Sequence, residues 1–236
     1  MTTSATLRLC VKNTKKAMSD VNIKRAFVIA MECEAEAVRP ALCGGDRLYV
    51  SGIGKVNAAA ATQLAICEGA DEIWNVGLSG GFGDVEVGGV YGVERAVEYD
   101  FDLAKLNGTS LGVLDEMKTP YIPLRTIADA AIRFPKFGGW RTLATGDRFN
   151  DREDDYDLIT RTLGASLRDM EGAAVAHVCM RRGVPCFSFK CVTNVAGGGS
   201  MTGQYNENRE RCLAVLREAM ARLGAMRLGS LGKDTK

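Results

Sequence analysis

The sequence predicts a single-domain α/β protein with a three-layer α/β/α arrangement around a central, mixed, mostly parallel twisted sheet. Short apolar runs that are typical of buried strands alternate with helical segments along the chain. Glycine-rich turns follow two of these runs. The 236 residues contain no internal repeat and no linker, and this length is enough for one sizeable core.

Each predicted strand is a run of apolar or β-branched residues bounded by glycine, proline or polar residues. The predicted strands cover 25–30, 47–50, 72–76, 87–97, 140–144, 166–169 and 185–192. Each predicted helix is an alanine-rich, polar or amphipathic segment, and several end at glycine. The predicted helices cover 32–42, 56–68, part of 123–134, 151–163, 170–182 and 207–223. Because strands alternate with helices, we expect most strand pairs to be parallel.

The two ends of the chain differ in composition from the segment between them. Residues 1–22 are polar with scattered lysines, so we expect a disordered leader without the apolar segment of a secretory signal. Residues 225–236 are rich in glycine and lysine and are expected to form a frayed tail. The folded domain is therefore predicted to span 23–224.

Composition argues against several classes of partner. A formal net charge of +1 gives no sign of the basic excess of nucleic-acid-binding proteins. No apolar run reaches the ~18 to 20 residues that span a bilayer, so no membrane partner is expected. The eight cysteines form no CxxC pair and there is one histidine, so we expect neither a metal site nor a cofactor. Cysteines placed among apolar residues indicate reduced thiols and a cytoplasmic location.

Two glycine-rich turns are candidates for ligand contact. Gly52–Gly54 and Gly77–Gly83 each follow a predicted strand, where ligands bind in α/β sheets. Their backbone N–H groups are then available to a ligand, because glycine permits close approach. Neither turn matches a Walker or dinucleotide-binding pattern, and tight turns without function explain them about equally well.

Acidic residues follow two predicted strands. Glu32, Glu34 and Glu36 open the first helix, where the helix dipole favours acids, but one of them is free to face a ligand cleft. Asp169 and Glu171 precede a helix with small, apolar residues and a buried appearance. A carboxylate buried there needs a partner, and sugar hydroxyls supply one. Capping of that helix by Asp169 or Glu171 is the alternative interpretation.

The last predicted strand carries two unusual polar residues. Lys190 lies inside an apolar run, so it either extends to the surface or pairs with a buried acid. Asn194 follows the strand, and its amide both donates and accepts hydrogen bonds, as contact with the edge of a base requires.

These segments, in this order, resemble the nucleoside phosphorylase superfamily, and most of all its hydrolytic branch, the methylthioadenosine/S-adenosylhomocysteine nucleosidases. The resemblance runs from about residue 25 to about residue 223. Each matching segment is weak alone, and their joint order and spacing carry the resemblance. The segments are 30–34, 51–56, 75–81, 145–149, 169–171 and 176–179.

The resemblance implies roles for the acids and their surroundings. Glu34 matches the acid that activates the attacking water, and Glu171 matches the acid that binds ribose hydroxyls. Asp169 and Met170 belong to the same sugar-binding segment. Met31 is expected to line the sugar pocket.

The resemblance also implies a purine subsite. Phe149 matches the aromatic side chain that stacks on the purine, and the backbone of Asn150 is expected to contact the base edge. Ser79 and Gly80 belong to the turn expected to contact substrate. His177 is interpreted as structural, because it lies in a helix that looks buried.

Three positions depart from the nucleosidase pattern. Asn194 stands where those enzymes have an aspartate that assists the leaving purine, and asparagine cannot supply a proton. Asparagine there resembles phosphorylases acting on 6-oxopurines, so adenine and a 6-oxopurine both remain open. Lys190 replaces an arginine near the water, which keeps the charge but loses the planar fork. Leu78 replaces a serine, and the adjacent Ser79 is a possible substitute.

Three functions follow from this comparison, of which purine nucleoside hydrolysis is favoured. A phosphate-dependent phosphorylase is the second, but few cations converge and Glu34 would repel phosphate. A non-catalytic nucleoside-binding or storage relative is the third. The partner is expected to be a small purine nucleoside. The resemblance also implies a homodimer in which Tyr99 and Phe101 close the neighbouring 5′ pocket, although exposed loop aromatics are an equal alternative.

Overall fold

The computed structural model describes residues 23–128, 132, 136–149 and 154–224. The predicted leader 1–22, the predicted tail 225–236 and Asn150 lie outside the described residues. No helix in the described ranges is long and apolar enough to cross a membrane.

Strands and helices alternate along most of the chain, as the apolar runs predict. The strands are β1 (Arg25–Ile29), β2 (Arg47–Val50), β3 (Glu72–Gly81), β4 (Val90–Glu98), β5 (Ile122–Pro123), β6 (Phe137–Thr145), β7 (Leu167–Asp169) and β8 (Cys186–Val195). The helices are α1 (Glu32–Val38), α2 (Lys55–Cys67), α3 (Ala104–Asn107), α4 (Asp154–Asp157), α5 (Gly172–Arg182) and α6 (Met201–Gly224). A 3₁₀ turn, η1 (Arg39–Ala41), follows α1, and a π-helical turn, η3 (Leu158–Thr162), follows α4.

The eight strands in the described part of the chain belong to one mixed sheet, in which five pairings are parallel and three are antiparallel. The mixed, mostly parallel character is as predicted. The expected simple layering differs in one respect, because β3, β8, β4, β6 and β7 pair in a closed ring. Antiparallel pairings of β7 with β3 and of β8 with β4 close this ring. A register shift in the pairing with β8 lies between Ser79 and Gly80. The residues of β3 after this shift, Gly80 and Gly81, also pair with β7.

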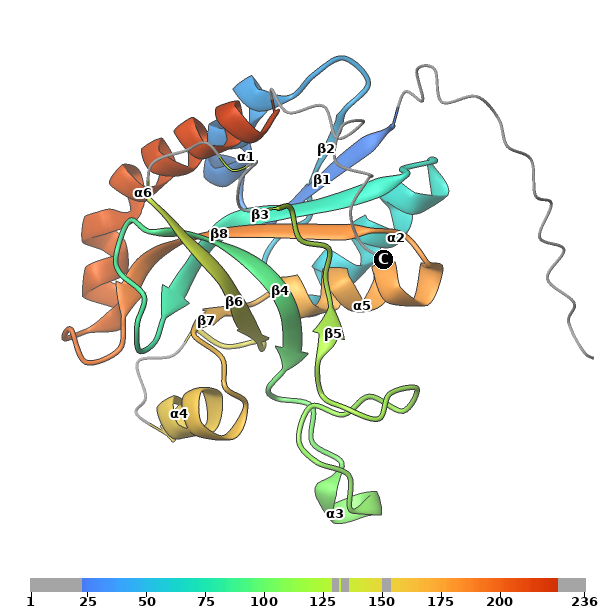
Figure 1. Cartoon of the computed structure of the whole chain (residues 1–236), viewed down its shortest axis with the longest axis vertical. Helices are drawn as coiled ribbons and strands as arrows, with labels where there is room; N and C mark the ends of the chain where they lie inside the picture. The colour runs from blue at the N-terminus through green and yellow to red at the C-terminus, as the bar shows by residue number, and fades with distance from the viewer. Residues whose placement is uncertain (1–22, 129–131, 133–135, 150–153, 225–236) are drawn as a thin grey trace, which may run out of the picture.

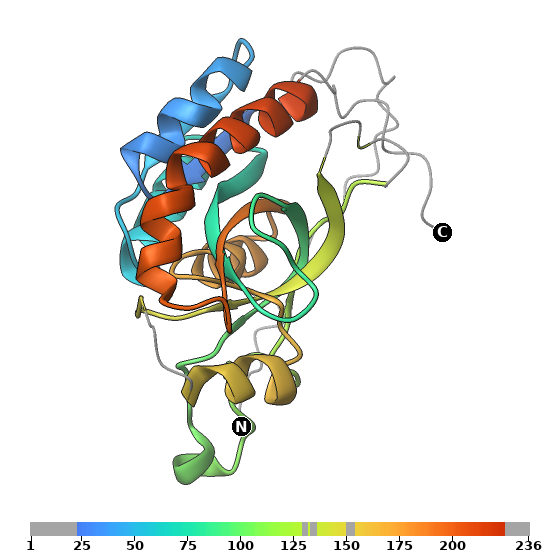
Figure 2. The same ribbon diagram turned by 90° about the vertical axis from the view of Figure 1, so that its left-hand side faces the viewer.

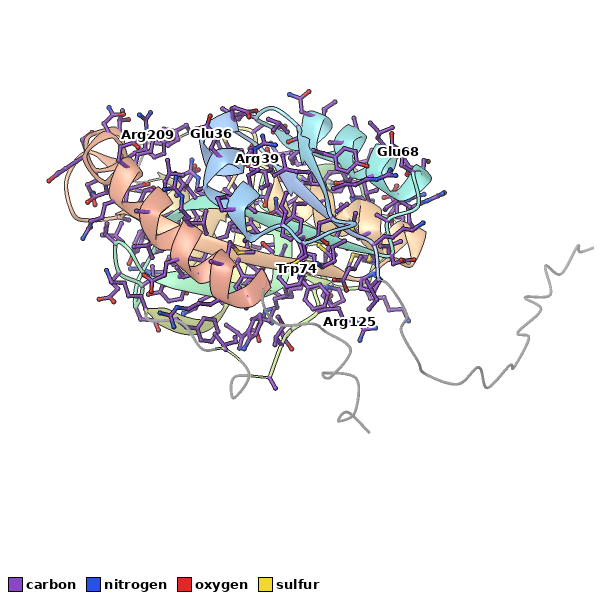
Figure 3. The ribbon with its side chains drawn as sticks, turned by 90° about the horizontal axis from the view of Figure 1, so that it is seen from above. Glu36, Arg39, Glu68, Trp74, Arg125 and Arg209 are labelled. Atoms are coloured by element: carbon purple, nitrogen blue, oxygen red, sulfur yellow. The ribbon has the colours of Figure 1, made fainter. Side chains whose placement is uncertain are left out.

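Helices cover the two faces of the sheet (Figure 1). On one face, α1 and α6 lie next to each other and pack on a core that includes Trp74 (Figure 2). The ring of Trp74, which is labelled in Figure 3, stacks on those of Phe187 and Phe27. The ring centroids are 4.9 and 5.8 Å apart, respectively. On the other face, α2 packs against α5 over a second core. Alternating strand residues therefore supply both cores, which is why these strands are almost wholly apolar.

Three element boundaries differ from the prediction. The segment predicted as a turn at Gly77 continues β3 as far as Gly81, because these residues pair with β8. No helix occurs at the described residues 124–128, and β5 lies just before them; residues 129–131 and 133–135 lie outside the described ranges. The last helix begins at Met201 rather than at Glu207.

The carboxyl ends of the strands meet at one edge of the sheet. The segments that follow β1, β6 and β7, together with the last residues of β3 and β8, converge there. The candidate residues of the sequence lie in these segments, so the fold gathers them in the place where α/β sheets bind ligands.

Candidate active site

Three carboxylates and one lysine form a buried cluster at this edge of the sheet. Glu34, Asp169, Glu171 and Lys190 are all less than 10% exposed. They come from α1, β7, the start of α5 and β8, which are far apart in the sequence. Buried charges are costly unless they are paired or hydrogen-bonded, so the partners of each group determine what the cluster does.

Glu34 is held by backbone N–H groups on both sides. Its Oε1 accepts from the Leu78 N–H at 2.7 Å and its Oε2 accepts from the Met31 N–H at 3.1 Å. Burial raises the pKa of Glu34, while the Leu78 N–H and Lys190 act against that rise. The approach to β3 requires glycine at position 77, because a Cβ there would lie 2.7 Å from Oε1. Of the three acids that open α1, Glu34 alone is buried.

Asp169 connects the strand ends to the lysine. Its Oδ1 accepts from the Thr145 hydroxyl at 2.6 Å, and its Oδ2 accepts from the Gly172 N–H at 2.8 Å. The same Oδ2 lies 2.8 Å from Lys190 Nζ. Asp169 therefore both caps α5 and pairs with the lysine, so Lys190 has a buried acid as its partner rather than the surface. Burial would lower the pKa of Lys190, but Asp169 and Glu171 raise it.

Glu171 precedes α5 and faces a glycine turn. Its Oε1 accepts from the Gly54 N–H at 2.8 Å, which shows that the turn at 52–54 contacts a carboxylate of the site. Its side chain does not cap the helix. Burial and the neighbouring Asp169 raise the pKa of Glu171 to about 7. A group with this pKa changes its charge within the neutral range.

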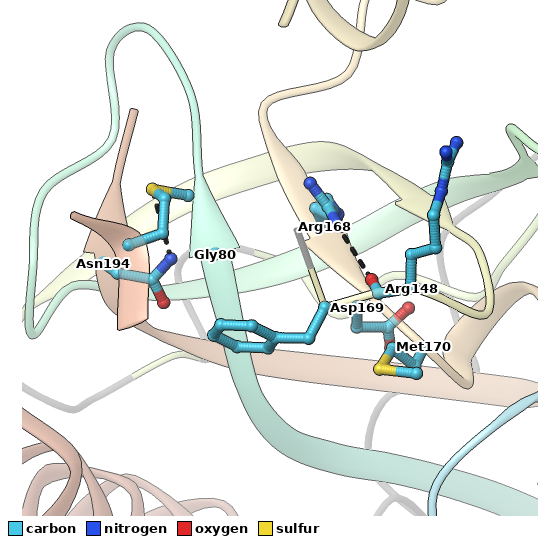
Figure 4. A pocket seen from close by; sticks show the side chains of 8 residues that line it. Gly80, Arg148, Arg168, Asp169, Met170 and Asn194 are labelled. Atoms are coloured by element: carbon cyan, nitrogen blue, oxygen red, sulfur yellow. Dashed lines mark hydrogen bonds between the residues drawn. The ribbon is translucent and has the colours of Figure 1, made fainter. Parts of the chain in front are cut away.

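A small pocket opens beside this cluster (Figure 4). Its volume is about 50 Å³, and it is lined by Gly80, Arg148, Phe149, Arg168, Asp169, Met170, Asn194 and Met201. Phe149 is 55% exposed, so its ring is accessible to a planar ligand at the pocket. Gly80 keeps one wall open, since a Cβ there would lie 3.3 Å from Asn194 Nδ2.

The Asn194 amide is oriented by its neighbours. Its Oδ1 accepts from the Thr193 hydroxyl at 2.6 Å, and its Nδ2 lies 3.4 Å from Met201 Sδ, which accepts weakly. The amide nitrogen therefore faces the pocket, and Asn194 presents a hydrogen-bond donor there.

The structure brings most of the predicted residues together. Met31 contacts the cluster through its N–H, and Met170 lines the pocket with Phe149. Ser79 lies next to Gly80, but it is not among the lining residues, and its buried hydroxyl has no hydrogen-bond partner within the described residues. Asn150 is outside the described ranges.

Three lining residues were not predicted from the sequence. Arg148 lies inside the matching segment 145–149 and Arg168 directly precedes the segment 169–171, so proximity to those segments was the available signal. Met201 lies in a glycine- and serine-rich stretch that gave no signal. The Arg168 guanidinium donates to the Arg148 carbonyl oxygen at 2.9 Å, and Arg148 lies 3.3 Å from Asp155.

Other candidates lie outside this pocket. His177 contacts Glu98 and Glu116 at 3.2 and 2.8 Å, which agrees with a structural role. Tyr99 is buried, so the alternative of an exposed loop aromatic is wrong for this residue, and Phe101 is partly buried. No group of three metal-binding side chains occurs among the residues that the structure describes.

Comparison with proteins of known sequence places the chain among nucleoside-processing enzymes. The 5′-methylthioadenosine/S-adenosylhomocysteine nucleosidase of Oceanobacillus iheyensis is 31% identical over 157 residues, which cover 64% of this chain and 68% of that protein. The corresponding enzyme of Marinomonas sp. is 32% identical over 159 residues, with the same coverage. The aminodeoxyfutalosine nucleosidase of Campylobacter jejuni is 28% identical over 159 residues, again covering 64% of this chain and 68% of the relative.

Solved structures share the fold. A mutant of the Helicobacter pylori enzyme with 5′-methylthioadenosine in its active site aligns with a TM-score of 0.76 at 19% identity, over 86% of this chain and 99% of that one. The Neisseria meningitidis nucleosidase in complex with methylthio-immucillin-A gives 0.75 at 24% identity, over 86% and 100%. The family model of the phosphorylase superfamily matches residues 41–225. This chain belongs to the phosphorylase superfamily.

Proposed function

We propose that this protein hydrolyses the N-glycosidic bond of a purine nucleoside and releases the free base and a ribose derivative. The observation that carries the proposal is the convergence of Glu34 and Glu171, two buried carboxylates, beside a pocket that presents Phe149 and Asn194. Carboxylates near a sugar and an aromatic ring near a base match the two halves of a nucleoside.

The chemistry assigns a separate task to each group. Glycosidic cleavage passes through an oxocarbenium-like state, which negative charge near the sugar stabilises. Glu34 accepts the proton of the attacking water, a contribution of about 10²- to 10⁴-fold. Glu171 accepts hydrogen bonds from the ribose hydroxyls. Phe149 stacks on the purine, and the Asn194 amide donates to an acceptor on the departing base.

The relatives suggest the class of substrate. The relatives from Oceanobacillus iheyensis and Marinomonas sp. are named for 5′-methylthioadenosine and S-adenosylhomocysteine, and the relative from Campylobacter jejuni for aminodeoxyfutalosine. We take methylthioadenosine and S-adenosylhomocysteine as the proposed substrates of this chain.

Water is favoured over phosphate as the nucleophile. Lys190 is the cation nearest to Glu34 in the cluster, and it is already paired with Asp169 at 2.8 Å. A phosphate next to Glu34 would meet a carboxylate rather than converging cations. A protein that only binds a nucleoside does not need a buried carboxylate that two N–H groups hold in place, as they hold Glu34.

A panel of nucleosides tests the proposal against binding without turnover. Methylthioadenosine, S-adenosylhomocysteine, adenosine, inosine and guanosine are offered to the protein, and base release is followed by chromatography while calorimetry measures binding. Release of base from at least one of them supports the proposal. Tight binding of a nucleoside without any release of base contradicts it.

We further propose that the protein is a cytoplasmic homodimer. Exposed apolar side chains in and just before α2 support a contact between copies, since Ile53, Val56 and Leu64 are 52%, 79% and 51% exposed. None of the seven cysteines within the described residues forms a disulfide, which agrees with a reducing compartment. Sedimentation is expected to give twice the chain mass of 25.4 kDa.

A further inference from the structure

Helix α6 directs three side chains at intervals of four residues along the active site. Met201, Tyr205 and Arg209 occupy positions i, i+4 and i+8, which lie on one face of a helix. Met201 lines the base pocket. The other two continue this face away from the base, toward α1, which packs against α6.

Tyr205 lies between the base and sugar ends of the site. Its ring contacts the edge of Phe149, with centroids 5.6 Å apart, and its hydroxyl lies 3.9 Å from Met31 Sδ. Burial and the Glu34 carboxylate raise the pKa of Tyr205, which places its hydroxyl within the field of the proposed catalytic acid. A substituent that leaves the sugar past Met31 therefore meets Tyr205 next.

Arg209 is one helical turn beyond Tyr205. Its guanidinium lies close enough to the Tyr205 hydroxyl to interact with it electrostatically, and the Arg209 side chain is 45% exposed. Its partner is Glu210, with Nη2 and Oε1 2.9 Å apart and the Glu210 side chain 77% exposed. Exposed ion pairs of this kind contribute little to stability. Replacement of Glu210 by a ligand carboxylate as the partner of Arg209 therefore costs little free energy.

We propose that Arg209 binds a carboxylate at the far end of the 5′ substituent of the substrate. The inference rests on the proposed function and adds to it a residue that favours substrates whose 5′ substituent ends in a carboxylate over substrates without one. A guanidinium forms two parallel hydrogen bonds with a carboxylate, and Tyr205 lies along the thioether chain that leads to it.

The test compares two substrates that differ in the carboxylate alone. S-adenosylhomocysteine is measured beside its decarboxylated analogue, 5′-deoxy-5′-(3-aminopropylthio)adenosine. The wild type is expected to have about fivefold higher kcat/KM for S-adenosylhomocysteine, the effect of one well-placed ion pair. R209M removes this preference, and R209K retains part of it.

Matched variants separate the guanidinium from general charge effects. Arg217 is exposed on the same helix two turns further on, so R217M keeps the wild-type preference. E210Q frees the Arg209 guanidinium and increases the preference. Equal kcat/KM for both substrates in the wild type, or a preference unchanged in R209M, overturns the inference while leaving hydrolysis in place. Failure to cleave any nucleoside contradicts the proposed function itself.

Discussion

Lys190 and Asp169 form a buried ion pair in which Nζ and Oδ2 are 2.8 Å apart. The side chains are 3% and 2% exposed, and Glu34 and Glu171 lie in the same cluster. The lysine therefore offsets part of the negative charge of the three carboxyl groups that the proposed chemistry keeps together. Within the described residues, this pairing with Asp169 occupies the lysine of the cluster, so it is not free to bind a phosphate nucleophile.

Removal of the lysine charge is expected to destabilise the fold. K190M leaves the Asp169 carboxylate buried without its cation, which costs about 3–5 kcal/mol in the free energy of unfolding. Urea denaturation measures the loss, with K118M at an exposed position as the control. A loss below about 1 kcal/mol would mean that the pair is not buried in solution.

Glu34 is expected to act on the water and not on the binding of the base. E34Q keeps the shape of the side chain but removes the base, so kcat should fall by about 10²- to 10⁴-fold. Purine binding, measured by calorimetry, should remain nearly intact. Glu36 is exposed on the same helix, and E36Q should retain wild-type turnover. Unchanged turnover in E34Q would remove Glu34 from the mechanism.

The raised pKa of Glu171 predicts the pH dependence of the reaction. Burial and Asp169 raise the pKa of Glu171 to about 7, and the ionised carboxylate is the form that accepts hydrogen bonds from ribose. Because the charged form increases as pH rises through this value, kcat/KM should rise to a plateau above about pH 7. The kcat/KM profile of the wild type and of E171Q checks this. A wild-type rise centred near the ordinary glutamate pKa of about 4.3 contradicts it.

Asn194 is expected to determine the preference between bases. N194D replaces the fixed amide donor with a carboxyl group that is able to carry a proton to the base. Release of adenine should then increase relative to release of hypoxanthine, which is measured as the ratio of kcat/KM for adenosine and inosine. Asn206 is exposed on α6, and N206D should leave this ratio unchanged. An unchanged ratio in N194D would show that Asn194 does not contact the base.

The local features of this fold could be predicted because they depend on short segments. Strand β2 was predicted at its observed bounds, and β1 and α2 within one residue at each end, since apolar runs and terminal glycines determine them. Acids that follow strand ends indicated two groups of candidates, and the family resemblance singled out Glu34 and Glu171 within them. These acids lie together because the ends of parallel strands meet at one edge of a sheet.

The remaining features depend on contacts between distant segments. The closed ring of strands forms because β7 pairs with Gly80 and Gly81, a relation with no local pattern. The glycine at position 77 suggested a turn, whereas its role is to admit the Glu34 carboxylate beside β3. Met201 lines the pocket because α6 begins before its amphipathic pattern becomes visible, so the sequence did not predict it.

Identification of the sugar product in the presence of inorganic phosphate tests the central claim most directly. The protein is incubated with methylthioadenosine or S-adenosylhomocysteine, with and without phosphate, and the sugar is identified by mass spectrometry. The account predicts the free ribose derivative at the same rate in both conditions. A ribose 1-phosphate derivative that is formed only when phosphate is present would contradict it.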